Sequence, residues 1–104
     1  MITKQQRTAL RSLAQELPDL VYIGKGDVTP NVVKQVNDNL FAHELIKIKV
    51  QDSASLSFDE ITAQLEKECG CETVCTIGNK IVLYKASKKP TNKSLEAIRN
   101  IMKK

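Results

Sequence analysis

The sequence predicts a single α/β domain in which helices cover a mixed four-stranded sheet, and three observations lead to this prediction. Apolar residues recur at helical and at strand spacing in the order αβαβαββ. Helices that connect one strand to the next predict parallel pairing through right-handed crossovers, and the closing hairpin adds an antiparallel strand. A chain of 104 residues suits one domain with one core.

The first predicted helix covers residues 3–17 and is amphipathic. Pro18 ends it, because proline cannot continue a helix. The apolar face is expected to pack on the core, and the basic face to meet solvent or a partner. The apolar residues are Ala9, Leu10, Leu13, Ala14 and Leu17, and the basic residues are Lys4, Arg7 and Arg11.

A short strand and a second helix are predicted next. Residues 20–23 are consecutive apolar residues of high strand propensity, and Gly24 ends the run. Thr29 is a favourable N-cap and Pro30 a favourable first helical residue, so a helix is expected from there to about Phe41.

The loop between this strand and helix has the sequence Gly24-Lys25-Gly26-Asp27. Its glycines allow positive φ and close approach of another backbone, and Lys25 adds a positive charge. Such a loop, followed by a helix N-terminus, directs backbone amides at an anion such as phosphate. The alternative interpretation is a tight turn with no ligand.

The second half of the chain contains three further elements and a turn. Residues 44–50 alternate apolar residues with Lys47 and Lys49, which predicts a half-buried strand with both lysines on its outer face. The segment from Ser57 to Glu60 matches a capping box that begins a helix ending near Gly70. The buried stripe of that helix is expected to contain Phe58, Ile61, Leu65 and Cys69. Strands over 72–77 and 80–84 flank Gly78-Asn79, a strong hairpin signal.

The end of the chain is basic and is expected to lie outside the domain proper. We place the domain at residues 1–88 and a basic tail at residues 89–104. Residues 85–93 are polar, as in an exposed linker. The tail is expected to contain a short helix, because apolar residues recur there at helical spacing; they are Leu95, Ile98, Ile101 and Met102.

Charge is distributed unevenly along the chain. The net charge of +4 combines +2 over residues 1–50, −5 over residues 51–79 and +7 over residues 80–104. One acidic and one basic surface are therefore expected. A basic surface most often meets nucleic acid or an anionic membrane, although a merely solvated lysine surface is the alternative.

The chain has no apolar run long enough for a membrane span or a secretory signal. Its three cysteines do not form a disulfide framework, which suits a reducing compartment. These features predict a cytoplasmic protein without a membrane partner.

The sequence offers little for catalysis. His43 is the only histidine, and nothing pairs it with a nucleophile. Cys69, Cys71 and Cys75 have an unusual spacing for zinc, and cysteines in helix and strand patterns behave as small hydrophobes. No metal, cofactor or small-molecule substrate is therefore expected.

Aromatic residues are scarce. They are Tyr22, Phe41, Phe58 and Tyr84. Most of them fall in core patterns, so base stacking is not expected to dominate any binding of RNA.

Five segments follow the pattern of a known family in unbroken order over residues 2–88. They are Thr3 to Arg7, Leu10 to Ala14, Ile23 to Thr29, His43 to Val50 and Ile77 to Lys85. Together they resemble the CRM domain, the chloroplast RNA splicing and ribosome maturation module, in its single-domain YhbY-like form.

This resemblance implies an α/β fold similar to the carboxy-terminal domain of bacterial translation initiation factor three. It also implies RNA binding associated with precursors of the large ribosomal subunit, and no enzymatic activity. The family's Gly-x-x-Gly loop, analogous to the loop that clamps RNA backbone in KH domains, falls on Gly24, Lys25, Gly26 and Asp27. Asp27 replaces the final glycine, and a carboxylate there is expected to repel phosphate unless it points away or caps the helix.

The sequence thus predicts a monomeric, non-enzymatic protein that binds ribosomal RNA or a precursor of the large subunit. Lys47 and Lys49 are further candidates for its RNA-binding surface. The rival interpretation is a protein-interaction adaptor whose basic tail binds an acidic partner. The expected RNA-binding residues are Gly24, Lys25 and Gly26 in the loop, Lys4, Arg7 and Arg11 in the first helix, and Lys85, Lys88 and Lys89 after the last strand.

Overall fold

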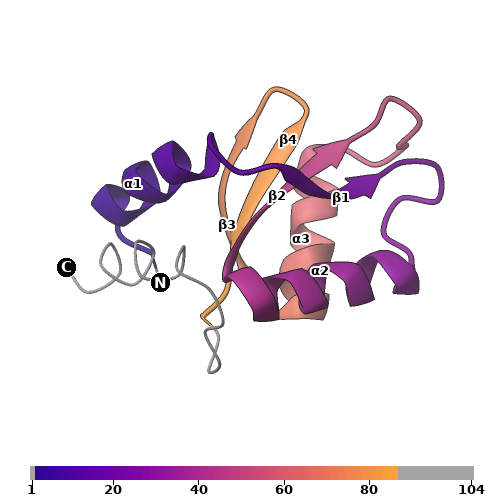
Figure 1. Cartoon of the computed structure of the whole chain (residues 1–104). Helices are drawn as coiled ribbons and strands as arrows, with labels where there is room; N and C mark the ends of the chain where they lie inside the picture. Colours follow the sequence, from indigo (N-terminus) through magenta and orange to yellow (C-terminus); the bar gives the residue numbers. More distant parts are fainter. Residues whose placement is uncertain (1, 87–104) are drawn as a thin grey trace.

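Residues 2–86 are described by a computed structural model, and they form three helices and four strands around one sheet (Figure 1). The predicted order αβαβαββ is confirmed. The elements are α1 (Lys4–Ala14), β1 (Asp19–Ile23), α2 (Pro30–His43), β2 (Leu45–Val50), α3 (Phe58–Cys69), β3 (Glu72–Ile77) and β4 (Lys80–Tyr84).

The sheet is mixed, as predicted, and its strands lie in the order β1-β2-β4-β3. β1 pairs with β2 in parallel, whereas β4 is antiparallel to both of its neighbours. The crossover through α3 places β3 two strand positions away from β2. The hairpin then places β4 between β2 and β3. Gly78 adopts φ +57° in the hairpin turn, a conformation that glycine adopts without strain.

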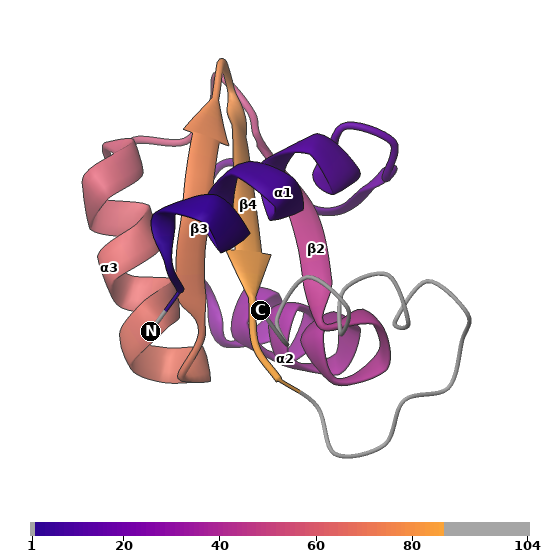
Figure 2. The ribbon, with the colours of Figure 1, turned by 90° about the vertical axis from the view of Figure 1, so that its left-hand side faces the viewer.

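The sheet has helices on both of its faces (Figures 1 and 2). It separates two apolar clusters. Helices α2 and α3 cover one face and bury the larger cluster, to which every strand except β3 contributes. Helix α1 packs on the other face and buries a smaller cluster. Residues 2–86 thus form a three-layer arrangement in which α1 is the one described helix on its side of the sheet.

The predicted helix caps are confirmed. The Ser57 side chain accepts from the N–H of Glu60 and the Glu60 side chain accepts in return from the N–H of Ser57, which completes the capping box of α3. Thr29 caps α2, and Gly70 ends α3 in the left-handed conformation.

Helix α1 ends three residues earlier than the predicted boundary at residue 17. From Gln15 onward, each N–H donates to the carbonyl three residues back rather than four, so the chain tightens out of the α-helix. The approaching Pro18 explains the change, because it disfavours helical geometry in the residue before it. Leu17 nevertheless packs against the smaller cluster.

None of the helices within residues 2–86 is long and apolar enough to cross a membrane. Lys88, Lys89 and the helix predicted from residue 95 lie outside the described residues.

Candidate nucleic-acid interface

The glycine loop links the end of β1 to the start of α2, as the sequence predicted. The N–H of Asp27 donates to the carbonyl of Gly24 at 2.9 Å and closes a tight turn. Gly26 adopts φ +94°, which side-chain-bearing residues rarely adopt. Lys25 and Gly26 are exposed in this turn, and no hydrogen bond within residues 2–86 engages their backbone N–H groups or the Lys25 ammonium.

A second loop, residues 51–57, lies against the glycine loop. The N–H of Gln51 donates to the carbonyl of Ile23 at 2.7 Å. A Cβ atom on Gly24 would lie 2.6 Å from Oε1 of Gln51 and 2.9 Å from Oγ of Ser53, so a side chain there would displace both. Gly24 therefore permits the close packing of the two loops.

Asp27 connects the same two loops through its carboxylate. Oδ1 accepts from the N–H of Ser55 at 2.8 Å and from the N–H of Leu56 at 3.0 Å, and Oδ2 accepts from the Ser55 hydroxyl. The Ser55 hydroxyl and the Leu56 N–H are the main causes that lower the pKa of this carboxyl below its ordinary value.

The backbone of Asp27 explains why this residue can stand where the family pattern has glycine. Its φ is +54°, and aspartate tolerates this left-handed region better than most residues. Its carboxylate is directed at residues 55 and 56 rather than at the loop tip. The carboxylate therefore points away from the tip, one of the two arrangements in which repulsion of phosphate is not expected.

The first turn of α2 offers fewer donors than its sequence suggests. Pro30 has no N–H, and the N–H of Val32 donates to Oγ1 of Thr29 at 3.1 Å. Asn31 alone in this turn has an N–H for which residues 2–86 supply no hydrogen bond. An anion at this site could therefore accept from one helix N–H, that of Asn31, and from the exposed amides of the glycine loop.

Three lysines lie on the sheet face opposite α2 and α3. Lys47 and Lys49 alternate with the buried Ile46 and Ile48, which pack toward α2 and α3, so both lysines point to the α1 side as predicted. Lys80 lies beside Lys49 in the pairing of β2 with β4.

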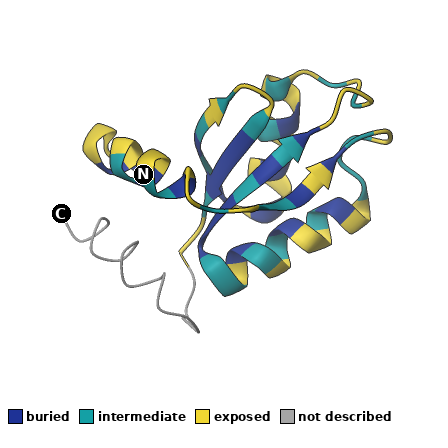
Figure 3. Cartoon of the chain, turned by 45° about the horizontal axis from the view of Figure 1, so that its top comes forward, coloured by how far each residue is buried: buried dark blue, intermediate teal, exposed yellow. Residues whose placement is uncertain are grey.

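The basic residues of α1 lie apart from the glycine loop. In Figure 1, α1 is on the left and the loop between β1 and α2 is on the right, and Figure 3 shows the same separation. Lys4, Arg7 and Arg11 are exposed. The structure therefore does not join the two predicted groups into one patch.

Arg7 also has a structural role that the sequence did not indicate. One of its guanidinium nitrogens donates to the carbonyls of Thr73 and Val74 in β3. The register of β3 against β4 shifts between Thr73 and Cys75, so these carbonyls belong to an irregular part of an edge strand. Arg7 thereby attaches α1 to the sheet.

Lys85 lies at the opposite end of β4 from the hairpin and the glycine loop. Its ammonium donates to the carbonyl of Cys69 at 2.8 Å, at the C-terminus of α3. A cation is favourable there because the last carbonyls of a helix carry partial negative charge. Lys85 is exposed, but this contact engages its ammonium within the domain.

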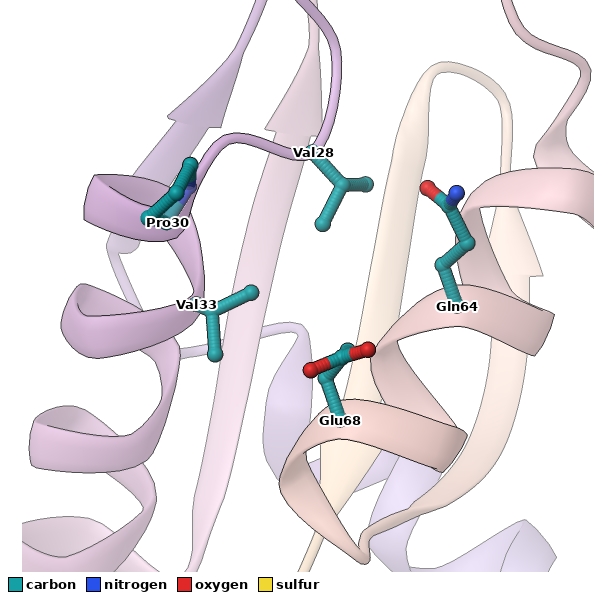
Figure 4. Close-up of a pocket in the computed structure, with 5 residues that line it drawn as sticks. All are labelled: Val28, Pro30, Val33, Gln64 and Glu68. Carbon is teal, nitrogen blue, oxygen red and sulfur yellow. The ribbon is translucent and has the colours of Figure 1, made fainter.

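A groove of about 340 Å³ lies between α2 and α3, on the far side of the sheet from the lysines (Figure 4). Val28, Pro30 and Val33 form one wall, and Gln64 and Glu68 of α3 form the other. Among the described residues that line it, the one charged side chain is that of Glu68, and α3 carries further exposed carboxylates. This side of the domain is therefore the predicted acidic surface and is unsuited to phosphate.

The cysteines behave as apolar residues. All three are free thiols, and Cys69 and Cys71 are buried. Burial raises the pKa of Cys71 to about 12, with a smaller effect from the neighbouring Cys69. Within residues 2–86, no group of three or more potential metal ligands is assembled.

Two of the four aromatic residues contradict the prediction that most of them lie in the core. Tyr22 is 53% exposed and Phe41 is 56% exposed. Tyr22 occurs in an apolar run, but alternation along β1 turns it away from the buried Val21 and Ile23. That alternation was the available signal, and a run of four apolar residues obscured it.

Comparisons with known proteins identify the family to which the chain is similar. A family model described as the CRS1 / YhbY (CRM) domain matches residues 2–85. The chain is 41% identical over 96 residues to the "Probable RNA-binding protein YqeI" of Bacillus subtilis, covering 92% of this chain and 98% of that protein. It is 31% identical over 86 residues to an "RNA-binding protein" of Haemophilus influenzae, covering 83% and 87% of the two chains.

A solved structure has the same fold. The solution structure of hypothetical protein SAV1595 from Staphylococcus aureus, described as a candidate RNA-binding protein, superimposes with a TM-score of 0.73 at 37% sequence identity. The match covers 86% of this chain and 93% of that one. With its glycine loop in place and the family model spanning residues 2–85, this chain belongs to the CRS1/YhbY (CRM) domain family.

Proposed function

We propose that this protein binds RNA and that its glycine loop contacts the phosphate backbone. The observation that carries the proposal is the exposed turn at Lys25 and Gly26, in which backbone amides and an ammonium are presented together. Hydrogen bonds from the second loop hold this turn in place, so little order has to be gained on binding. The names of the relatives favour RNA as the anion.

We further propose that the RNA is ribosomal RNA or a precursor of the large ribosomal subunit, bound in the cytoplasm by a monomer without a catalytic step. The family resemblance supports the ribosomal target and the absence of a catalytic step. Lys4 and Arg11 on α1 would provide a second contact for an RNA long enough to reach both regions, and Lys88 and Lys89 remain proposed contacts outside the described residues.

Titration of ribosomal RNA fragments at several salt concentrations tests RNA binding. If four to six phosphates are contacted, log K falls against log salt with a slope of roughly −3 to −5. A flat salt dependence would contradict an interface built on phosphate contacts.

The contribution of the loop is tested by Lys25→Glu, which reverses the charge at the exposed tip. Lys67→Glu is a matched control, because Lys67 is also an exposed lysine and lies on the acidic side of the domain. We expect the first variant to weaken binding by roughly tenfold or more and the second to have a much smaller effect. Equal losses would mean that only net charge matters.

Crosslinking in cells, followed by sequencing of the attached RNA, tests the ribosomal assignment. Fragments of large-subunit RNA are expected, together with co-sedimentation of the protein with large-subunit precursors. Purification with and without ribonuclease separates this function from that of an adaptor, because a protein-interaction adaptor retains its partners after the RNA is digested.

A further inference from the structure

The sheet face that carries α1 is covered at one end only. Helix α1 packs on Leu45, Val74 and Val82 through the smaller apolar cluster. Toward the glycine loop, the same face of the same strands has no helix of residues 2–86 above it (Figure 3). This uncovered part of the sheet, which we call the open end, begins directly beside the loop.

The open end has an aromatic ring at its edge. Tyr22 is 53% exposed, whereas its neighbours Val21 and Ile23 are completely buried on the opposite face. It lies two residues before Gly24, on the edge strand β1. A phenol ring that a strand holds outward in this way costs little further entropy when a ligand packs on it.

Tyr22, Lys49 and Lys80 form a row of neighbouring side chains across β1, β2 and β4. Tyr22 lies opposite Lys49 in the pairing of β1 with β2, and Lys49 lies opposite Lys80 in the pairing of β2 with β4. The ammonium of Lys80 is 2.8 Å from Oδ2 of Asp19, which neutralises this lysine. Within residues 2–86, neither Lys47 nor Lys49 has an acidic partner, so the row keeps a net positive charge.

A flat aromatic ring beside uncompensated lysines matches the chemistry of one class of ligand. Aromatic side chains stack on bases, and neighbouring cations contact the phosphates of the same strand. A base must be unpaired to reach such a ring, because in a duplex its faces are already stacked. Lys25, two residues beyond the strand end, extends the positive charge from the sheet to the loop tip.

We propose that Tyr22 stacks on an unpaired base of a single-stranded RNA segment that crosses the open end, with Lys49 and Lys25 at its phosphates. This inference rests on the proposed RNA binding and specifies the kind of RNA bound. The strand continues from the sheet onto the glycine loop, so the sheet and the loop together form one binding surface.

Tyrosine fluorescence offers a direct test, because the chain contains two tyrosines and no tryptophan. In a Tyr84→Phe variant, which keeps the ring that packs on the smaller cluster, Tyr22 is the remaining tyrosine. The variant is titrated with a labelled oligouridylate of about 12 nucleotides, and binding is followed by anisotropy of the label. We expect Tyr22 emission to be quenched with the same midpoint as the anisotropy.

Variants provide the second measurement. We expect Tyr22→Ala to raise the Kd for the oligonucleotide by at least about 5-fold, and Tyr22→Phe to change it by less than about 2-fold. Phe41→Ala is the matched control. Phe41 is 56% exposed, but it lies on α2, which packs on the sheet face opposite the open end. This control variant is expected to bind like the unchanged protein, and a duplex of the same length is expected to bind without quenching.

Two results would overturn the inference. The first leaves the proposed function intact, and the second overturns both. If the oligonucleotide binds and Lys25→Glu weakens it, but quenching is absent and Tyr22→Ala binds normally, stacking is wrong and the proposed function stands. If no RNA binds even at low salt, the proposed function fails and the inference fails with it.

Discussion

The covered and open ends of one sheet face differ in the chemistry of their side chains, although the same strands build both. On β2, Leu45 packs against α1, and four residues later Lys49 points in the same direction. On β4, Val82 is buried under the helix, and Lys80 two residues earlier is not. The position of α1 thus follows the apolar part of the face, and the lysine part is left for solvent or an anionic ligand.

The two ends are also stabilised by different interactions. Apolar burial dominates under α1, where Leu10 and Ala14 are completely buried. At the loop end, polar contacts dominate, with Asp27 and the backbone N–H of Gln51 connecting two loops. Substitutions at the first end should therefore affect stability, and substitutions at the second end should mainly affect binding.

The largest expected effect is on stability, from Leu10→Ala. The substitution leaves a cavity between α1 and the sheet and should lower the free energy of unfolding by about 2–5 kcal/mol. Tyr22→Ala, at the open end, should change it by less than about 0.5 kcal/mol. Urea unfolding followed by circular dichroism measures both, and equal losses would remove the distinction between the two ends.

A smaller loss of stability is expected from Arg7→Ala. It removes the two hydrogen bonds to the carbonyls of β3 and should lower the free energy of unfolding by about 1–2 kcal/mol. Lys4→Ala is the control, because Lys4 is exposed on the same helix. If both variants unfold at the same urea concentration, the contacts of Arg7 contribute nothing to the attachment of α1.

The strands, the hairpin and the helix caps could be predicted from the sequence, because residues close together in the chain determine them. The alternation in residues 44–50 placed Lys47 and Lys49 opposite the buried isoleucines, and Gly78-Asn79 predicted the hairpin. The caps at Thr29 and Ser57 followed from side chains that satisfy helix N–H groups within three residues.

The remainder depends on contacts between residues distant in sequence. Nothing near Asp27 in the sequence indicates that its carboxylate accepts hydrogen bonds from residues 55 and 56, because the pairing of β1 with β2 brings the two loops together. The contacts of Arg7 with β3 likewise join positions more than 60 residues apart. The separation of α1 from the glycine loop is a property of the topology, so a list of basic residues could not reveal it.

Lys49 at the open end can be compared with Lys85, whose ammonium contacts the C-terminus of α3 on the other side of the sheet. Lys49→Ala should leave stability within about 0.5 kcal/mol and reduce the magnitude of the salt slope of RNA binding by roughly 1. Lys85→Ala removes a cation from the C-terminus of α3 and should cost about 0.3–1 kcal/mol of stability. Urea unfolding and RNA titration of both variants test whether Lys49 acts in binding and Lys85 in stability. An unchanged salt slope for Lys49→Ala would exclude Lys49 from the interface.

The smallest effect is expected from Asp27→Asn, and it depends on pH. Hydrogen bonds from Ser55 and Leu56 hold the folded pKa of Asp27 below its ordinary value of 3.8. A lowered folded pKa means that the unfolded chain binds the proton more tightly, so the carboxylate stabilises the fold above its ordinary pKa. This contribution is lost as the pH falls through the folded value.

The measurement for Asp27 is the change in urea midpoint between pH 6 and pH 3, compared between the two proteins. Other carboxylates titrate over the same range in both, so the difference between the two changes reports Asp27 alone. We expect a smaller change in Asp27→Asn. Asparagine also tolerates the φ of +54°, so the backbone of the loop is kept. An identical pH dependence would mean that the carboxylate's charge does not stabilise the contact between the two loops, and the rigidity of the glycine loop would need another source.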